Sequence, residues 1–385
     1  MLNKARAIKE QIVAWRREFH QHPELGFQEN RTAARLAEVC TELGWRVRTG
    51  VGRTGVVADL GSGSPMVAVR ADMDALPLQE ANQCAYRSRI DGVMHACGHD
   101  SHLACALGVA RLLKEETFPG SVRLIFQPSE EVADEEGISG APRMIDDGAL
   151  EGVDLILALH VDPGTPSGIV RIDSGPASGG VDSWFAEVRG KGGHGAHPHE
   201  TVDPFYLSAH VIMALNAIVS RRLDPTLPAV VSIGSLHGGQ AENVIPDAVR
   251  MTGTLRYTEK SIQEAIHSEL RRSFETVRSL GGDYELRFEL GTPPMLNHPL
   301  AAGLIREAAV PLIGEANVLS WKVELGAEDF GSFLDRVPGA MFALGTSDGK
   351  HDWHLHSPDF DLDEEALPVG VAVMTAAILK YLRKS

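Results

Sequence analysis

The sequence predicts an α/β fold in which a mostly parallel sheet, covered on both faces, is interrupted by a smaller α+β domain. Two observations indicate the larger sheet. Short apolar runs lack the polar alternation of half-exposed strands, which is typical of strands buried on both faces. Helical patterns lie between these runs, and alternating strands and helices favour a parallel sheet. A third observation indicates the inserted domain, because the composition turns to Gly, Ser and Pro at two separate places.

Four apolar runs provide the strands of the larger domain: Met66–Ala71, Val122–Phe126, Val153–Leu159 and Ala340–Gly345. Between the first two, His102–Glu115 has apolar residues at helical spacing and predicts a helix that packs on the sheet. Open α/β sheets bind ligands in the loops beyond the carboxyl ends of their strands. We therefore look for the functional residues in the loops that follow these four runs.

Two segments rich in Gly, Ser and Pro, Asp173–Gly180 and Gly291–Pro299, bound the inserted domain. We predict that residues 176–292 form this insert, which serves as a lid or dimerisation domain. Residues 1–175 and 293–385 then form one discontinuous catalytic domain.

The insert shows the order strand, helix, strand, strand, helix, strand. This order is typical of the split βαβ arrangement. Its strands alternate between apolar and polar residues, as expected where one face of a sheet is exposed. The predicted elements are the strands Ser183–Arg189, Val230–Ser235, Val249–Tyr257 and Tyr284–Leu290 and the helices Asp203–Ser220 and Lys260–Leu280.

Composition and charge exclude several classes of partner. The chain has 385 residues, more than one ordinary domain holds, and 43% of them are hydrophobic. A formal net charge of −16 argues against nucleic acid or an anionic membrane as a partner. No stretch approaches the roughly 20 apolar residues of a membrane span, so we expect no membrane partner.

The amino terminus and the cysteines indicate a cytoplasmic protein. The first 24 residues have the pattern of a charged amphipathic helix and lack the apolar core and cleavage site of a secretory signal. Four scattered cysteines make no disulfide framework for a chain of this size, which fits a reducing compartment. We therefore expect a cytoplasmic location.

Five residues that can bind a metal follow strand-like or tightly turned stretches: Cys97, His99, Glu131, His160 and His356. Cys97 and His99 flank a glycine just before a predicted helix, so both side chains can project into one volume. A lone buried histidine is more often a hydrogen-bonded core residue than a ligand, but these residues form a set. Together they indicate a two-metal hydrolytic site. The mixed Cys, His and Glu ligands suit Zn or Mn, and also Co or Ni, rather than Mg or Ca.

The adjacent pair Glu130 and Glu131 has two interpretations. Two unneutralised carboxylates raise each other's pKa, so one interpretation is that the pair begins a solvated acidic surface run. The preceding apolar strand ends in Pro128 and argues against this, because it places the pair at the mouth of a buried strand. There one carboxylate can bind metal while the other faces the substrate.

Nine motifs carry a resemblance to a known family. They are RADMDALP (Arg70–Pro77), HACGHD, QPSEE, ALH at His160, GKGGHGAHPH (Gly190–His199), AENVIPD (Ala241–Asp247), GTLR (Gly253–Arg256), GAEDFG (Gly326–Gly331) and LHSP (Leu355–Pro358). The chain resembles the aminoacylase and carboxypeptidase superfamily of dinuclear metal amidohydrolases, in the branch with hippurate hydrolases, N-acetyldiaminopimelate deacetylases and plant auxin-conjugate hydrolases. The resemblance spans nearly the full length. One stretch departs from it, since Glu131–Ile138 is acidic where these relatives usually have glycine.

The resemblance implies roles for particular residues. Glu131 is the metal ligand of the acidic pair, and Glu130 is the general acid and base. Asn243 and Arg256 bind the carboxylate of the substrate, for which the planar guanidinium of Arg256 is well suited. His194 donates to the oxyanion from a partner subunit of a homodimer. We further expect Asp74 to orient a histidine that binds metal.

These features predict a metal-dependent N-acyl-L-amino-acid amidohydrolase with two divalent ions in each subunit and a small N-acyl amino acid as substrate. The main alternative is a dipeptidase or carboxypeptidase-type peptide hydrolase with the same site, because both reactions break one amide near a free carboxylate. A non-catalytic binding protein with this fold would be expected to lack Glu130 or a ligand. This chain keeps them all.

Overall fold

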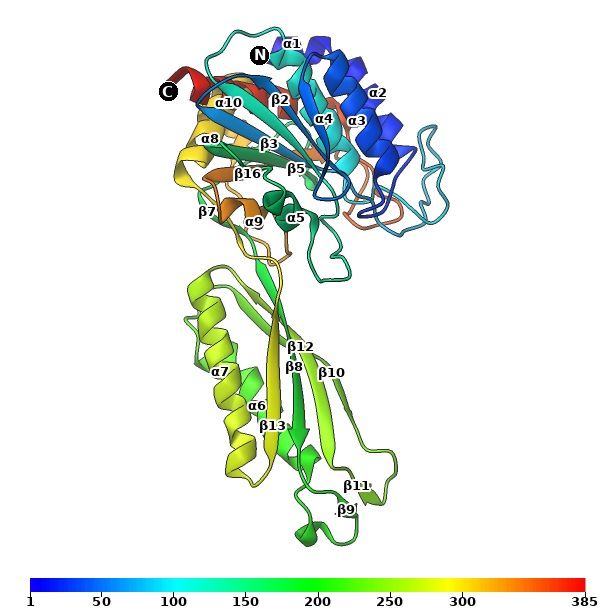
Figure 1. Cartoon of the computed structure of the whole chain (residues 1–385), viewed down its shortest axis with the longest axis vertical. Helices are drawn as coiled ribbons and strands as arrows, with labels where there is room; N and C mark the ends of the chain where they lie inside the picture. The colour runs from blue at the N-terminus through cyan, green and yellow to red at the C-terminus, as the bar shows by residue number, and fades with distance from the viewer. Residues whose placement is uncertain (385) are drawn as a thin grey trace. The chain divides into compact units, whose positions relative to one another are not determined.

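The computed structural model describes residues 1–384 and forms two compact units, which Figure 1 labels by element. The first unit holds Met1–Gly175, Leu296–Lys322 and residues 332–384, and the second holds Pro176–Met295 and Val323–Gly331. The predicted insert, residues 176–292, runs through most of the second unit, and Val323–Gly331 lies outside it. The chain passes between the units in β7 (Gly175–Ser178) and β14 (Met295–Asn297), and again at either end of Val323–Gly331.

The first unit is built on an eight-stranded sheet. Across the sheet the strands are β1 (Arg46–Val51), β2 (Gly55–Gly61), β4 (Ser121–Gln127), β3 (Met66–Asp72), β5 (Leu155–Pro166), β16 (Gly339–Ser347), β6 (Val170–Arg171) and β15 (Val318–Leu319). The central strands β4, β3, β5 and β16 are parallel to one another. The pairs β1 with β2, β2 with β4, and β16 with β6 are antiparallel.

The predicted mostly parallel sheet of an α/β fold is confirmed. The four apolar runs of the sequence correspond to β3, β4, β5 and β16. The sequence pattern missed β1 and β2, because β1 exposes most of its side chains and β2 is buried for only half its length. All seven residues of β4 are buried, so this central strand is covered on both faces.

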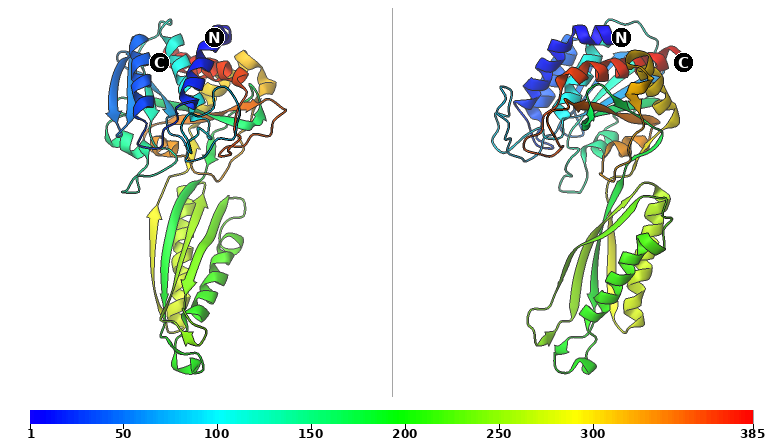
Figure 2. Two further views of the ribbon diagram at one scale, coloured as in Figure 1. Left: turned by 90° about the vertical axis from the view of Figure 1, so that its right-hand side faces the viewer. Right: turned by 180° about the vertical axis from the view of Figure 1, so that it is seen from behind.

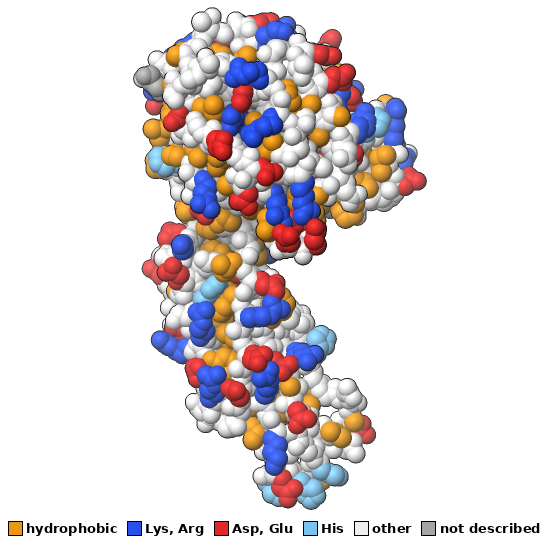
Figure 3. Space-filling model, viewed as in Figure 1, with side chains coloured by type: hydrophobic (Ala, Val, Ile, Leu, Met, Phe, Trp, Pro, Cys, Tyr) orange, Lys and Arg blue, Asp and Glu red, His pale blue; other side chains and the backbone are white. Residues whose placement is uncertain are grey.

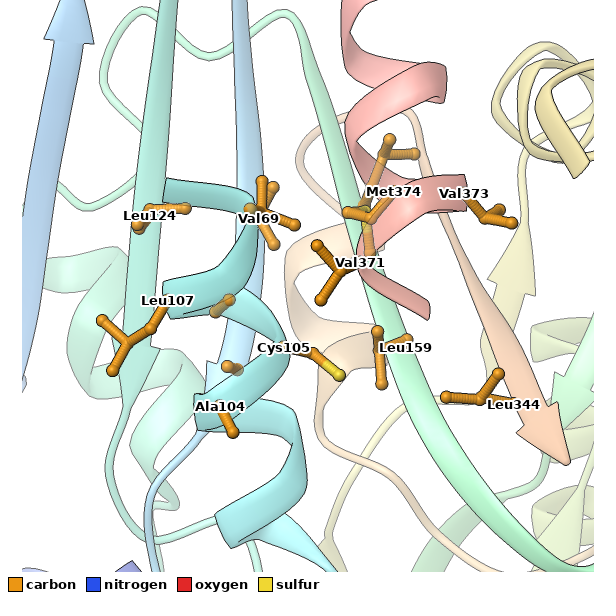
Figure 4. Packing of buried hydrophobic residues seen from close by; sticks show 14 of the residues in the cluster. Val69, Ala104, Cys105, Leu107, Leu124, Leu159, Leu344, Val371, Val373 and Met374 are labelled. Atoms are coloured by element: carbon orange, nitrogen blue, oxygen red, sulfur yellow. The ribbon is translucent and has the colours of Figure 1, made fainter. Parts of the chain in front are cut away.

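The main core of the first unit joins the sheet to the helices α3 (Asn30–Glu42), α4 (His99–Leu113), α8 (Pro299–Ile313) and α10 (Leu367–Lys384), and the two amino-terminal helices add buried residues to it. Figure 4 shows Leu107 of α4 and Val371 of α10 packed among Val69, Leu124 and Leu159 of the sheet. Burying a side chain of this size contributes roughly 1.5–3 kcal/mol. This packing fixes the start of α4 against the ends of the strands.

The amino-terminal segment forms two helices rather than the single expected one. α1 (Leu2–Ala7) ends at Ile8, whose backbone leaves the helical region, and α2 (Lys9–His20) follows. The remaining helices are short: α5 (Gly140–Asp146), α9 (Phe330–Leu334), and the 3₁₀ turns η2 (Glu315–Asn317) and η3 (Glu364–Ala366).

The carboxyl-terminal segment is the one part of residues 1–384 that is long and apolar enough to cross a membrane by length and composition. It is Glu364–Lys384. However, 78% of its apolar window is buried inside the structure, as in the core helix of a folded domain.

The second unit is a four-stranded antiparallel sheet with two helices on one face, as the two views of Figure 2 show. Its strands lie in the order β10 (Ala229–Gly238), β12 (Ala248–Tyr257), β8 (Gly180–Arg189) and β13 (Asp283–Leu290). The helices α6 (Pro204–Arg221) and α7 (Lys260–Ser279) bury a core around Trp184 and Phe274. The order of elements along the chain is compatible with the predicted split βαβ arrangement.

One end of the second unit carries a small ribbon. β9 (Gly193–His194) pairs with β11 (Val244–Ile245), and the 3₁₀ turn η1 (Pro198–Glu200) follows β9. β9 comes just after the end of β8, and β11 comes just before the start of β12. Because β8 and β12 are antiparallel neighbours, both segments lie at the same end of the sheet.

Candidate functional site

The loops that carry the predicted ligands converge because their strands are parallel. β3 and β4 end side by side, and Glu130 and Glu131 follow β4 within four residues. His160 of β5 lies beside Ala343 of β16. Parallel neighbours present their carboxyl ends at one edge of the sheet, so side chains distant in sequence meet there.

The five predicted ligands form two groups that share one residue. Ligand atoms of Cys97, His99 and His160 lie within 4.8 Å of one another, and so do those of Cys97, Glu131 and His356. Two overlapping groups with a common member can hold two ions with Cys97 between them. The structure therefore brings together all five residues that the sequence singled out.

The turn at Gly98 allows Cys97 and His99 to face the same volume. Gly98 has φ +86°, in the left-handed region that favours glycine. A Cβ atom at this position would lie 2.4 Å from Val161 Cγ2, so no larger residue fits without movement. His99 begins α4 immediately after this turn. The glycine is thus required by the backbone that positions both ligands.

Two histidines are placed so that the tautomer that metal binding requires can form a hydrogen bond with a backbone carbonyl. His99 Nδ1 lies 2.9 Å from the carbonyl oxygen of Asp74, and His160 Nδ1 lies 2.8 Å from that of Val161. Each Nδ1–H can donate to its carbonyl, which leaves Nε2 with a lone pair for an ion. Within residues 1–384, the buried Nε2 of His99 has no hydrogen-bond partner. An unsatisfied buried nitrogen beside a thiol and a carboxylate fits a divalent transition-metal ion.

The electrostatics of the site favour a cation. Burial lowers the pKa of His99, but Asp72, Cys97 and Asp74 outweigh burial and raise it well above its ordinary value. The hydrogen bond to Glu131 raises the pKa of His356. Burial raises the pKa of the Cys97 thiol, whereas a bound divalent ion deprotonates a thiol ligand outright. The carboxylates of Asp72 and Asp74, which raise the pKa of His99, would also stabilise a metal ion.

Behind the predicted ligands lies a buried chain of hydrogen bonds that the sequence analysis did not predict. Asp72 accepts from Arg70 Nη1 at 2.6 Å and lies 2.6 Å from His102 Nδ1. His102 Nε2 in turn accepts from the backbone N–H of Val161, next to His160. Burial lowers the pKa of His102 to about 4, so this ring is neutral and its two nitrogens have fixed roles. The RADMD motif held the signal for Asp72, but nothing local pointed to His102.

Glu130 faces the ligand cluster. Its carboxylate lies within 4.8 Å of ligand atoms of His99 and Glu131. Asp74 Oδ2 accepts from the backbone N–H of Glu131 at 2.9 Å, and Asp74 Oδ1 lies 3.3 Å from His99 Nδ1. Asp74 is therefore beside a histidine of the cluster, where its predicted orienting role needs it.

The acidic stretch after Glu131 is neutralised locally. Asp134 forms ion pairs with Arg53 at 2.7 Å and with Arg143 at 2.6 Å. Glu135 pairs with Arg53, and Glu136 pairs with Arg143. These contacts separate the surface acids of the loop from Glu130 and Glu131, so the two halves of the acidic run have different environments.

The predicted substrate-binding residues lie in the second unit, at its two ends. His194 is exposed in β9, and Gly195 N–H donates to the carbonyl of Asn243 at 2.8 Å, so His194 and Asn243 are neighbours. Figure 3 shows histidine side chains gathered at this end of the unit. Arg256 is near the far end of β12, beside Val181 of β8. Eight residues of strand at about 3.3 Å each separate Arg256 from Ala248, a span of about 26 Å.

Comparison with known proteins finds one family model, described as peptidase family M20/M25/M40, over residues 68–380. Thermostable carboxypeptidase 1 of Saccharolobus solfataricus is 37% identical, over 99% of this chain and 98% of that protein. N-acetyl-L-cysteine deacetylase of Bacillus subtilis is 37% identical, over 94% and 85%. A solved dinuclear metal-binding peptidase of the M20 family from Bacillus subtilis is 31% identical, with a TM-score of 0.86 over 99% of this chain and all of that one.

Proposed function

The chain belongs to peptidase family M20/M25/M40, and from this we propose that it is a metal-dependent N-acyl-L-amino-acid amidohydrolase. It hydrolyses the amide between an acyl group and an amino acid with a free carboxylate. The single observation that carries this proposal is the pair of ligand groups that share Cys97, with the Glu130 carboxylate beside them. The deacetylase relative supports the acyl-amino-acid class of substrate.

The chemistry assigns each side chain a separate task. When bound, two divalent ions, Zn²⁺ or Mn²⁺ in our proposal and Co²⁺ or Ni²⁺ as alternatives, lower the pKa of a water molecule and polarise the amide carbonyl. Cys97, His99, His160, Glu131 and His356 would hold the ions. Glu130 accepts the proton of the attacking water and then donates it to the departing amine, which would otherwise be a poor leaving group.

Binding of the substrate carboxylate is the task proposed for Arg256 and Asn243, and stabilisation of the oxyanion is the task of His194. His194 and Asn243 are neighbours beside the start of β12, whereas Arg256 lies about 26 Å along β12 from that start. Within one second unit these residues cannot contact the same substrate. We therefore propose a homodimer, in which His194 and Asn243 of one subunit complete the site of the other. We also propose that the enzyme acts in the cytoplasm.

A peptide hydrolase with the same site is the second candidate. It is favoured by the carboxypeptidase relative, which matches this chain over nearly its whole length. Both reactions require a carboxylate-binding residue and a general acid. They differ in the acyl group of the amide that is cleaved. It comes from a simple carboxylic acid in an acyl amino acid and from an amino acid in a peptide.

A substrate screen separates the two candidates. The protein is loaded with Mn²⁺ or Zn²⁺, and release of free amine is followed for N-acetyl, N-benzoyl and indole-acetyl amino acids and for dipeptides. The proposal predicts amine release from one or more acyl amino acids and a much slower reaction with dipeptides. Faster hydrolysis of dipeptides would favour the peptide hydrolase, and no hydrolysis of either class would refute both.

A further inference from the structure

The turn that carries Glu130 is held by two carboxylates from distant parts of the chain. Glu29 Oε1 accepts from the backbone N–H of Ser129 at 2.8 Å, and Asp74 Oδ2 accepts from that of Glu131 at 2.9 Å. The amides immediately before and after Glu130 are therefore both anchored to buried acids. Asp74 already has a place in the predicted site, whereas Glu29 has none.

Ser129 adopts a backbone conformation that needs such support. Its φ is +46°, in the left-handed region that non-glycine residues rarely occupy. The side chain is buried, and its hydroxyl donates to the carbonyl of Val132 at 2.8 Å. Its carbonyl accepts from Gly140 N–H at 2.8 Å. The turn is thus strained, tightly enclosed and fixed from several sides.

Glu29 is built into the fold at this point. Its residue is fully buried, just before α3, and its Oε2 accepts from the hydroxyl of Thr54 at 2.5 Å. Both carboxylate oxygens therefore have a partner, one in the β1–β2 turn and one in the turn that bears Glu130. A buried carboxylate is costly unless it is hydrogen-bonded, so its retention here indicates a specific contact.

The contact does not depend on the charge of Glu29. Burial raises the pKa of Glu29 to about 7, while the hydrogen bond from Thr54 opposes this rise. When the carboxyl is protonated, its O–H can donate to the Thr54 hydroxyl and Oε1 still accepts from Ser129. Glutamine has the same shape as this neutral form and can make the same two hydrogen bonds.

We propose that Glu29 is a positioning residue for Glu130, which fixes the strained turn at Ser129 and so aims the Glu130 carboxylate into the ligand cluster. This inference rests on the proposed role of Glu130 as general acid and base. It adds a residue that touches neither the predicted ions nor the substrate. Misplacing a catalytic group by about 1 Å costs on the order of 10²-fold in rate, so a loose turn should be visible in kcat.

The test compares Glu29→Ala and Glu29→Gln in the metal-loaded enzyme. Glu29→Ala should lower kcat by about 10- to 100-fold while KM stays within about twofold and both metals remain bound. Glu29→Gln should stay within about threefold of the wild type, because it keeps both hydrogen bonds. Leu36→Ala, which removes a buried side chain from the helix that follows Glu29, controls for general loss of stability. Should Glu29→Ala fail to fold, Glu29→Asp replaces it, since the shorter acid cannot bridge Thr54 and Ser129.

A double variant isolates the path of the effect. If Glu29 acts only through Glu130, then adding Glu29→Ala to Glu130→Gln should cause no further loss in kcat. A loss that persists undiminished in the Glu130→Gln background would overturn the proposal, as would a wild-type kcat in Glu29→Ala. By contrast, an unaltered rate in Glu130→Gln alone would refute the proposed general acid rather than the role of Glu29.

Hydrogen exchange gives a readout that needs no turnover. Backbone amides of the peptide spanning Ser129–Glu131 should exchange faster in Glu29→Ala than in the wild type, and at the wild-type rate in Glu29→Gln and Leu36→Ala. Unchanged exchange in Glu29→Ala would show that the turn does not depend on Glu29, whatever the substrate proves to be.

Discussion

The ligand cluster of the first unit and the substrate-binding candidates of the second unit are organised in opposite ways. The cluster is assembled from four segments at one edge of a sheet, and His99 and His160 each have a backbone carbonyl within hydrogen-bond distance of Nδ1. In the second unit, His194 is exposed on a small ribbon beside the start of β12, and Arg256 lies about 26 Å along β12 from that start. One chain thus gathers its candidate metal ligands in one place but distributes its proposed substrate-binding groups.

This difference teaches which part of the reaction one chain can perform alone. Metal binding as proposed depends on contacts within the first unit, where backbone carbonyls orient the rings of His99 and His160. Substrate binding as proposed needs groups from both ends of the second unit. The length of the strand β12 keeps these two ends apart. The comparison predicts that damage to the first unit abolishes the chemistry, whereas damage to the second unit weakens binding or is repaired by a partner.

The largest effect is expected at the shared ligand. Cys97→Ala should lower the metal content and reduce activity by more than the roughly 10²–10⁴-fold that one general acid–base group contributes, because both ligand groups lose a member. Cys105→Ala, at a cysteine of α4 that is buried in the apolar core (Figure 4), is the matched control and should keep its metal. Metal analysis and the thiolate charge-transfer band of the cobalt-loaded protein provide the measurement. Full occupancy in Cys97→Ala would mean that the thiol is only a packing residue.

A smaller loss should separate chemistry from metal binding. Glu130→Gln should retain both ions and lose about 10²–10⁴-fold in kcat, since the amide cannot carry the proton. Metal content and kcat are measured on the same preparation. Activity near that of the wild type would remove Glu130 from the mechanism and would leave the ligand cluster as the only functional part of the comparison.

The second unit should respond mainly in substrate affinity. Arg256→Lys keeps the charge but loses the planar fork for a carboxylate, so we expect kcat/KM to fall by about 10- to 100-fold, chiefly through KM. Arg250→Lys, on the exposed face of the same strand and paired with Glu187, is the control and should change neither constant. An equal effect of the two substitutions would contradict a specific role for Arg256.

The last effect concerns stability rather than rate. Because the pKa of Glu29 is raised from 4.5 to about 7, the folded state binds this proton more tightly than the unfolded state. The associated stability is fully present below about pH 4.5 and is lost as the pH rises through about 7, up to about 3 kcal/mol. Glu29→Gln lacks this dependence. The free energy of unfolding is measured in urea for the metal-free variant and the metal-free wild type. As the pH rises between these two values, it should fall more for the wild type than for the variant. A difference that stays constant with pH would contradict the raised pKa.

The sequence predicted the parts of the site that are encoded locally. Buried strands without alternation identified β3, β4, β5 and β16, and the predicted metal ligands at or beyond the ends of these strands lie close together in the structure. The motifs also indicated the family, which the comparisons confirmed. The helix after Gly98 was predicted to begin at His102, and it begins three residues earlier, at His99.

Other features could not be predicted because they depend on contacts between distant segments. Glu29 reaches Ser129 across 100 residues, and His102 reaches the backbone of Val161 only once the sheet is formed. The pairing of Arg53 and Arg143 with the acidic loop likewise has no local signal. Arg256 and Asn243 were assigned to one carboxylate from motifs alone, and only the length of β12 shows that one chain cannot bring them together.

The most direct test of this account mixes two inactive variants, Glu130→Gln and His194→Ala, under conditions that allow subunits to exchange. If His194 acts across the dimer, each mixed dimer has one intact site and one doubly defective site. Half of all dimers are mixed after random exchange of equal amounts, so about a quarter of the wild-type activity should return. Absence of any recovery despite proven exchange, or full activity in a strictly monomeric enzyme, would contradict the composite site.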